Sequence, residues 1–252
     1  MIFLLGGTSE TAPLAMALAQ VRYRVLVSTA TEISLDIGAH QLISRRSGHL
    51  DTSALASLLR AQQAIAVVDA THPYALTAHA TAKDAAAIVG IPCLRYVRSV
   101  ATPTITEDVI YAANHEEAAR VAVSFDRPIL LTTGSRNLEL YARAARAKSV
   151  PLIARVLPEA ASLKACQNAG LAAEHIVAGR GPFSVEENQA LIRKFSIGVL
   201  VTKDSGQAGG VPAKLESARL EHCRVVVVER PTQSPAQSFD NVADLVKALA
   251  AR

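Results

Sequence analysis

Short runs of apolar residues alternate with amphipathic segments of helical length along almost the whole chain. Runs such as AIAVVDA (64–70) and RVVVVE (224–229) have the length and the β-branched content of buried strands. Buried strands that are separated by helices form parallel βαβ units, with right-handed crossovers and helices on both faces of the sheet. The sequence therefore predicts an α/β protein built on parallel sheets.

The pattern restarts near residue 99, which predicts two Rossmann-like α/β domains, 1–98 and 99–252, with a ligand cleft between them. The stretch 99–108 contains a proline and several polar β-branched residues, so it is expected to be a linker or an edge. Expected strands cover 1–5, 23–28, 64–70, 91–97, 128–133, 151–156, 175–179, 197–202 and 224–229. Expected helices cover 9–21, 51–63, 75–89, 114–124, 137–147, 159–169, 184–195, 211–222 and 240–251.

Charge and cysteine content narrow the class of partner. The net charge is +4, without a Lys/Arg run, which argues against nucleic acid and fits an anionic small molecule. The three cysteines are scattered, so neither a disulfide framework nor a metal site is expected. No apolar run reaches the ~18 residues that span a bilayer, and no signal peptide is evident. We expect a soluble cytoplasmic protein without a membrane partner.

Polar residues cluster where the predicted strands end. Ligands of open parallel sheets bind beyond the carboxyl ends of the strands, and the opposite ends carry no comparable clusters here. This distribution is the strongest indication of a site that the residues give. The clusters are GGTSE (6–10), Ser28-Thr29, THPYA (71–75), TTGSRN (132–137), Arg155, GRGPFS (179–184) and TKDSGQ (202–207).

The first cluster has the position of a phosphate loop but not its G-x-G-x-x-G spacing. Gly6 and Gly7 permit a tight turn and close approach of backbone N–H groups to a phosphate, and Thr8 or Ser9 can cap the next helix. A plain strand-to-helix turn is the alternative. Ser28 and Thr29 stand where NAD-binding sheets carry an acidic residue, so a 2′-phosphate is tolerated and NADP is favoured over NAD. Both residues can also simply end a strand.

Asp69 and His72 mark the THPYA cluster. His72 could bind a phosphate, a ribose or a substrate carboxylate, although a solvated or capping histidine is the commoner case. Asp69 lies inside an apolar strand, and a buried carboxylate needs partners, which loop N–H groups or His72 could supply. Asp69 can therefore be purely architectural.

The TKDSGQAGG stretch is the densest polar segment. Lys203 could neutralise an anion or donate a proton during a reduction, and Asp204 could orient it, whereas an Asp-Ser-Gly turn is the structural alternative. Arg136, Arg155 and Arg180 fall at strand ends, and three arginines around one cleft would suit a ligand with several carboxylates. Each alone would be an ordinary surface residue.

Together these segments resemble the precorrin-6A reductase family of cobalamin biosynthesis. The resemblance covers residues 1 to about 230. It implies an NADPH-dependent oxidoreductase that reduces one ring double bond of a polycarboxylated tetrapyrrole, precorrin-6A, to give precorrin-6B. It also implies two Rossmann-like domains that share one nucleotide, the N-terminal domain binding NADP. The segments that carry it are GGTSE, DATHPYA (69–75), LRYVR (94–98), TTGSRNL (132–138), ARVLP (154–158), GPFS-EEN (181–188) and TKDSG (202–206).

The resemblance and the strand-end clusters together give an expected site. The catalytic candidates are Lys203, Asp204 and Ser205. The cofactor-binding candidates are Gly6, Gly7, Thr8, Glu10, Ser28, Thr29, Thr71, His72, Pro73, Tyr74, Gly134, Ser135 and Lys203. The substrate-binding candidates are Arg136, Arg155 and Arg180, and no metal is expected.

Two other functions stay open at this point. An NADP-binding sensor or a tetrapyrrole carrier without turnover would share the fold. A sugar-nucleotide epimerase would need Tyr-x-x-x-Lys, but Tyr74 is followed by Ala78. We expect a monomer or a small homo-oligomer, with transient contacts to neighbouring pathway enzymes. The sequence leaves open whether the substrate carries cobalt.

Overall fold

The computed structural model describes residues 1–32, 35–97, 108–206, 209–230 and 238–250 of the chain. The chain divides into two compact units, one formed by 1–98 with 232–252 and the other by 99–231. Both units are α/β, as the sequence predicts. In the described part of the chain, no helix has the length and apolar character needed to cross a bilayer.

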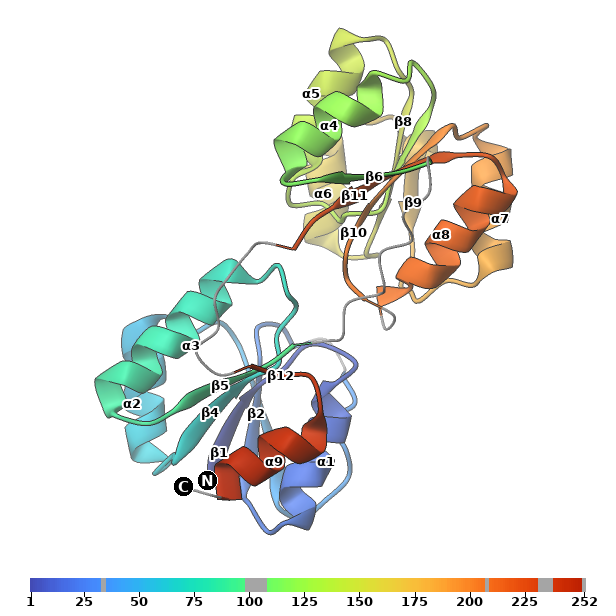
Figure 1. Ribbon diagram of the computed structural model, residues 1–252. Helices are drawn as coiled ribbons and strands as arrows, with labels where there is room; N and C mark the ends of the chain where they lie inside the picture. Colours follow the sequence, from blue (N-terminus) through green and yellow to red (C-terminus); the bar gives the residue numbers. More distant parts are fainter. Residues whose placement is uncertain (33–34, 98–107, 207–208, 231–237, 251–252) are drawn as a thin grey trace. The chain divides into compact units, whose positions relative to one another are not determined.

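The first unit is a parallel sheet covered by helices on both faces (Figure 1). Its strand order is β12-β5-β4-β1-β2-β3. The strands are β1 (Ile2–Leu5), β2 (Val25–Thr29), β3 (Ile43–Ser47), β4 (Ala66–Asp69), β5 (Cys93–Tyr96) and β12 (Ser238–Phe239). The helices are α1 (Thr11–Gln20), α2 (Thr52–Ala61), α3 (Leu76–Val89) and α9 (Val242–Ala250).

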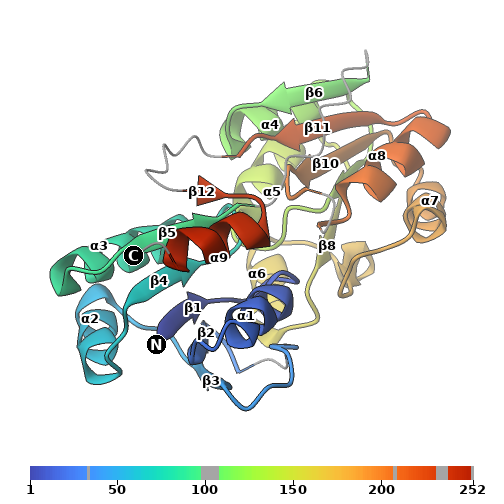
Figure 2. The ribbon, with the colours of Figure 1, turned by 60° about the horizontal axis from the view of Figure 1, so that its bottom comes forward.

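Alternation along the strands builds a separate core on each face of this sheet. Leu4 of β1 packs with Leu14 and Leu18 of α1 and with Leu245 of α9. Phe3, one residue earlier, packs on the other face against α2 and α3. Successive side chains of a strand point to opposite faces, so a strand buried on both sides is apolar throughout. Figure 2 shows α1 and α9 on the same face of the sheet.

The second unit repeats this architecture with the strand order β6-β11-β10-β7-β8-β9. Helices α7 and α8 cover the face that carries Leu130, Ile153 and Leu200. The strands are β6 (Val109–Ala112), β7 (Ile129–Leu131), β8 (Leu152–Val156), β9 (Ile176–Ala178), β10 (Val199–Lys203) and β11 (Arg224–Val228). The helices are α4 (His115–Val123), α5 (Leu138–Ala147), α6 (Ala160–Asn168), α7 (Val185–Lys194) and α8 (Val211–Leu220), with a 3₁₀ turn at Ala173–His175.

Both sheets have the Rossmann order 3-2-1-4-5-6, but the sixth strand of each comes from outside its run of five. Strand β6 follows β5 in the chain, yet it pairs with β11 of the second sheet. Strand β12 follows β11, yet it pairs with β5 of the first sheet, where Ser238 lies beside Arg95. The two sheets therefore exchange their sixth strands.

This exchange corrects the predicted second domain, 99–252. Its start near residue 99 agrees with the division of the chain, but residues 232–252 belong to the first unit. The apolar side of α9, with Leu245 and Leu249, packs against α1, and β12 extends the first sheet at β5. The local pattern of a strand and a helix does not encode which of two similar sheets they join.

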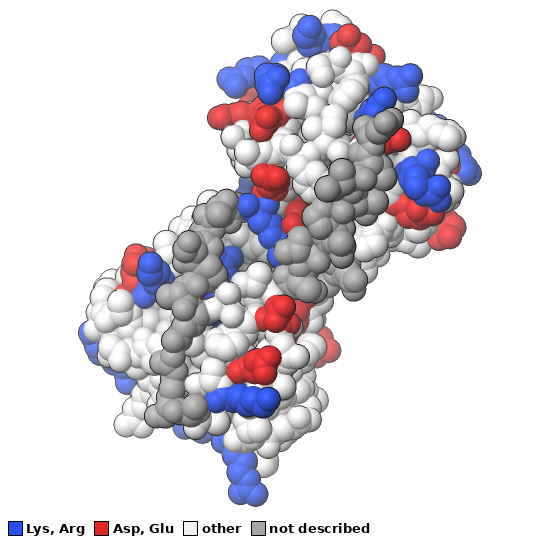
Figure 3. Space-filling model, in the orientation of Figure 1, with Lys and Arg blue, Asp and Glu red and all other residues white. Residues whose placement is uncertain are grey.

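The nine predicted helices and nine predicted strands are confirmed to within two residues at each end. Strands β3, β6 and β12 were not predicted. All three lie at sheet edges, where side chains are partly exposed and apolar runs are not required. The expected linker 99–108 falls outside the described residues except at its last position. On the face in Figure 3, acidic and basic side chains are interspersed, which agrees with the small net charge.

Candidate functional site

The predicted polar clusters lie at the carboxyl ends of the strands in both units. In an open parallel sheet, ligands bind where the strand order reverses. In the first sheet this point lies between β1 and β4, which are followed by GGTSE and THPYA. In the second sheet it lies between β7 and β10, which are followed by TTGSRN and TKDSGQ. Each unit therefore presents a candidate ligand-binding edge. The predicted cleft between the units stays a prediction.

The GGTSE turn is built around Thr11, which the sequence analysis did not single out. The N–H groups of Gly7 and Thr8 donate to Thr11 Oγ1 at 3.1 and 3.2 Å. A Cβ on Gly6 would lie 2.6 Å from Thr11 Cγ2, and Gly7 has a φ of 117°, which favours glycine. The local structure thus favours glycine at both positions, independently of any ligand.

Helix capping by Thr8 or Ser9 is not what the structure shows. Helix α1 begins after Glu10, and no side chain forms a hydrogen bond at that N-cap. The Thr8 hydroxyl instead donates to the carbonyl of Ala70 at 3.0 Å. This bond ties the turn after β1 to the segment after β4, so the two switch-point loops of the first unit are held together.

Two arginines of the unpredicted strand β3 reach the end of β2. Arg46 Nη1 donates to Ser28 Oγ at 2.8 Å, and Arg45 Nη2 donates to Thr29 Oγ1 at 3.0 Å. Parallel pairing sets Ser28 beside Arg46 in the register. The only sequence signal was an Arg-Arg pair inside ISRRS. Ser28 and Thr29 are thus part of a basic, hydroxyl-rich edge.

Asp69 at the end of β4 is bound by His79 of α3, not by His72. His79 Nδ1 lies 2.6 Å from Asp69 Oδ2, and both side chains are buried. The N–H and hydroxyl of Thr71 donate to Asp69 Oδ1 at 3.0 and 2.7 Å. Arg95 Nη2 lies 2.7 Å from His79 Nε2. Since a guanidinium only donates, Nε2 accepts and the ring proton on Nδ1 faces Asp69.

This network fixes the start of the THPYA loop. Burial opposes ionisation of Asp69, but the hydrogen bonds from His79 and Thr71 outweigh it and hold the pKa of the carboxyl below 3.8. Both donors of Thr71 bind Asp69, and the loop also carries His72 and Tyr74, whose side chains are partly buried. Their rings lie 5.6 Å apart, and Tyr74 N donates to His72 Nδ1 at 3.4 Å.

The TKDSGQ loop in the second unit places Lys203 at the end of β10, partly buried. Burial and the charge of Arg136 lower the pKa of Lys203 to about 8. Asp204 forms an ion pair with Arg230 at 3.1 Å, a partner that the sequence analysis did not foresee. Ser205 is buried, and its hydroxyl lies 3.5 Å from Gly209 O. Of the three, Lys203 has the chemistry of a proton donor near neutral pH.

The remaining predicted residues of the second unit differ in burial. Gly134 has a φ of 82°, and Ser135 Oγ donates to Ser162 Oγ at 3.2 Å. Arg136 is exposed, although its charge acts on Lys203. Arg180 is exposed and lies 3.5 Å from Glu159. Arg155 is buried, and its Nη1 donates to Asn188 Oδ1 at 2.8 Å.

Two six-stranded parallel sheets with the Rossmann strand order, and with polar loops at their switch points, define the class of a Rossmann-like α/β protein. The family model described as "Precorrin-6x reductase CbiJ/CobK" matches residues 1–250. The chain belongs to this family, as the resemblance predicted.

Curated relatives extend over essentially the full length of the chain. A cobalt-precorrin-6A reductase of Priestia megaterium is 32% identical over 250 residues, covering 99% of this chain and 98% of the relative. A precorrin-6A reductase of Rhodococcus erythropolis is 34% identical over 252 residues, covering 97% and 95%. The solved structure titled "CobK precorrin-6A reductase" has a TM-score of 0.78 at 24% identity, over 99% of this chain and 96% of that one. The structural match supports the fold.

Proposed function

We propose that the protein reduces one ring double bond of precorrin-6A, with NADPH as the hydride donor. The observation that carries this proposal is the pair of polar switch-point edges in a chain that belongs to the precorrin-6x reductase family. NADPH would supply a hydride to one carbon of the double bond, while a proton reaches the other carbon, leaving NADP⁺ and the reduced tetrapyrrole.

The end of β2 fits the 2′-phosphate of NADPH. Arg45 and Arg46 bring two guanidinium groups to the hydroxyls of Thr29 and Ser28, and no acidic side chain occupies either position. Arginines near this point of a Rossmann sheet accommodate a 2′-phosphate. The turn at Gly6, Gly7 and Thr8, with Glu10 behind it, is the proposed neighbour of the diphosphate.

In the second unit we assign Lys203 as the group that delivers the proton. Its lowered pKa suits transfer at neutral pH, and its position at a switch point suits contact with a ligand. Arg155 and Arg136 are proposed to bind substrate carboxylates, and Gly134 and Ser135 to approach the nucleotide from this unit. The exposed Arg180 would act at the margin of the same edge.

Replacing Arg45 and Arg46 by alanine should weaken NADPH without weakening NADH. Each lost charged hydrogen bond to a phosphate costs ~1.5–3 kcal/mol, so the KM for NADPH should rise at least about tenfold. The KM for NADH, which has no 2′-phosphate, should change less than about threefold. Steady-state kinetics with both nucleotides measure this ratio. Arg24→Ala, an exposed arginine before the start of β2, is the control. An equal rise for both nucleotides would contradict a 2′-phosphate site.

Anaerobic assays with NADPH and precorrin-6A, cobalt-free and cobalt-bound in parallel, test the reaction itself. The relatives of this chain include cobalt-precorrin-6A reductases and precorrin-6A reductases, so the assay needs both forms of the substrate. Loss of nicotinamide absorbance with either substrate is the expected result, and the substrate consumed assigns the branch. NADPH that binds but is not oxidised by either would refute the reductase and favour a sensor or a carrier.

A further inference from the structure

Arg155 carries a buried hydrogen-bond donor for which the described residues offer no acceptor. Its side chain is 7% exposed, and its guanidinium lies 4.1 Å from the centre of the Phe183 ring. Nη1 is held by Asn188, whereas Nη2 is buried and has no hydrogen-bond partner among the described residues. A buried charged donor without an acceptor is costly, so native structures rarely leave one unsatisfied.

Lys214 of α8 is a second cation at the same place. Its Nζ donates to the carbonyl of Gly209 at 3.2 Å. Burial, followed by the charges of Arg155 and Lys203, lowers the pKa of Lys214 to about 8. Within the part of the chain that the structure describes, neither Arg155 nor Lys214 forms an ion pair with a carboxylate. The two cations therefore lie close enough to repel each other without a protein anion between them.

The GRGPFS loop explains how β8 and α8 bring these side chains together. The Phe183 ring, on which Arg155 stacks, packs so closely on Gly179 and Gly181 that a Cβ at either would lie about 3 Å from it. Pro182, the preceding residue, lies 3.6 Å from the Cβ position of Gly210, the N-cap of α8. Lys214 follows one turn later on that helix.

Glu187 is the carboxylate that acts electrostatically on Arg155, but it is already engaged. Its Oε2 accepts from the N–H of Ser184 at 2.7 Å in the capping box of α7. A lysine that served only to fill space here would be less stable than a methionine, because burying a charge without a partner costs more than the packing contributes. The cluster is thus unfavourable for stability alone.

We propose that Arg155 and Lys214 together bind one carboxylate of the tetrapyrrole substrate. The inference rests on the proposed function and adds Lys214, which the sequence analysis did not consider, as a binding residue. The unused Nη2 of Arg155 would donate to one carboxylate oxygen, and the Lys214 ammonium would neutralise the same group. A nucleotide phosphate also presents anionic oxygens to Arg and Lys, so the experiment must distinguish substrate binding from nucleotide binding.

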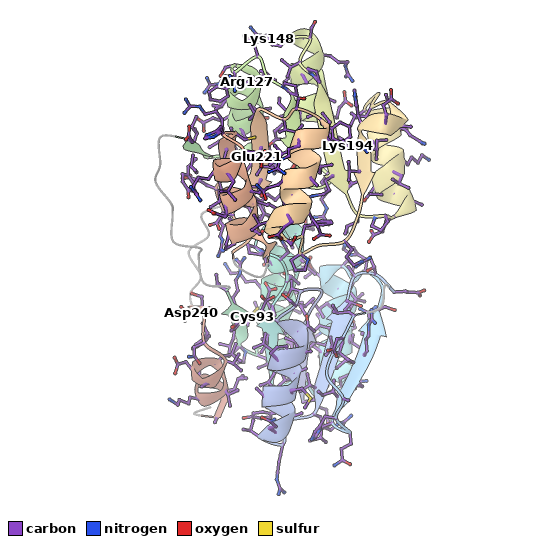
Figure 4. All side chains as sticks on the ribbon, turned by 90° about the vertical axis from the view of Figure 1, so that its right-hand side faces the viewer. Cys93, Arg127, Lys148, Lys194, Glu221 and Asp240 are labelled. Atoms are coloured by element: carbon purple, nitrogen blue, oxygen red, sulfur yellow. The ribbon has the colours of Figure 1, made fainter. Side chains whose placement is uncertain are left out.

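The test is Lys214→Met, compared with Lys148→Met. Lys148 is an exposed lysine of the same unit, and Figure 4 shows it with Arg127 at the end where the strands begin, away from the switch-point edge. Precorrin-6A is titrated anaerobically without NADPH, and its own absorbance reports binding. NADP⁺ is titrated separately. Lys214→Met should raise the Kd for precorrin-6A at least about tenfold. Lys148→Met should leave it unchanged.

Further variants and a melting temperature separate ligand binding from folding. Lys214→Arg should keep the Kd for precorrin-6A within about threefold, because the charge remains. The melting temperature of the Lys214→Met variant without ligand should not fall below that of the wild type. If the methionine variant does not fold, the titrations are made with Lys214→Gln. An unchanged Kd for precorrin-6A, or a raised Kd for NADP⁺ instead, would overturn the assignment. Wild-type protein that binds precorrin-6A but does not oxidise NADPH would refute the reductase proposal alone.

Discussion

Lys203→Met is expected to lower kcat by about a hundredfold or more, the usual contribution of a positioned proton donor. The ammonium of Lys203 has a pKa of about 8, so it is protonated at neutral pH and yet gives up its proton readily. The neighbouring His115 is not an alternative donor, because burial and the charge of Lys203 lower its pKa to about 4 and leave it neutral. The measurement is kcat for NADPH oxidation with saturating precorrin-6A.

The pH profile and a second variant separate proton donation from simple charge. The acid form of Lys203 is the active one, so wild-type kcat should be constant below pH 8 and should fall as the pH rises through the pKa of about 8. Lys203→Arg keeps the charge but cannot release a proton, so it should restore KM and not kcat. Full kcat in Lys203→Met would show that the proton comes from another source.

Asp69→Ala is expected to lower the free energy of unfolding by ~3–5 kcal/mol, because two buried donors lose a charged acceptor and each such hydrogen bond contributes ~1.5–3 kcal/mol. The substitution leaves His79 and the Thr71 hydroxyl without their buried acceptor. For a chain of this size the melting temperature should fall by ~6–20 °C. The stability that Asp69 contributes is present above pH 3.8, its ordinary pKa, and should decline as the pH falls through its lower pKa in the folded state.

Asp84→Ala is the matched control for this measurement, since Asp84 is an exposed carboxylate on α3, the helix that carries His79. It should change the free energy of unfolding by less than about 0.5 kcal/mol. Equal stability of Asp69→Ala and Asp84→Ala would mean that the network after β4 does not hold the loop. Chemical denaturation with urea gives both free energies.

The sequence revealed the central strands of both sheets because burial on both faces requires continuous apolar runs. It did not reveal β3, whose residues Ile43–Ser47 are all partly or fully exposed, or β12, which is two residues long. Edge strands are specified by pairing with a neighbour, and that information is not local. The same limit hid the strand exchange, since β6 and β12 are each followed by an ordinary helix.

The candidate site was foreseen where one residue type at a strand end carries the chemistry, as with Lys203 and Arg155. The sequence analysis missed residues that interact with a partner on a different strand or helix. Arg46 reaches Ser28 from 18 residues away, and His79 reaches Asp69 from the first turn of the next helix. The sequence analysis did not single out Lys214 of α8, because its environment depends on packing against α7 and on the Phe183 loop, which local sequence does not encode.

The exchange of sixth strands has a consequence for how the chain is made. On the ribosome, β1 to β5 emerge before residues 99–231, but the helix that covers Leu14 and Leu18 of α1 emerges only after them. Apolar surface that waits uncovered during synthesis is prone to aggregate. A premature stop codon after residue 231 would spare every strand of the second sheet and would strip β12 and α9 from the first, so a lesion downstream of the second unit damages the unit that is translated before it.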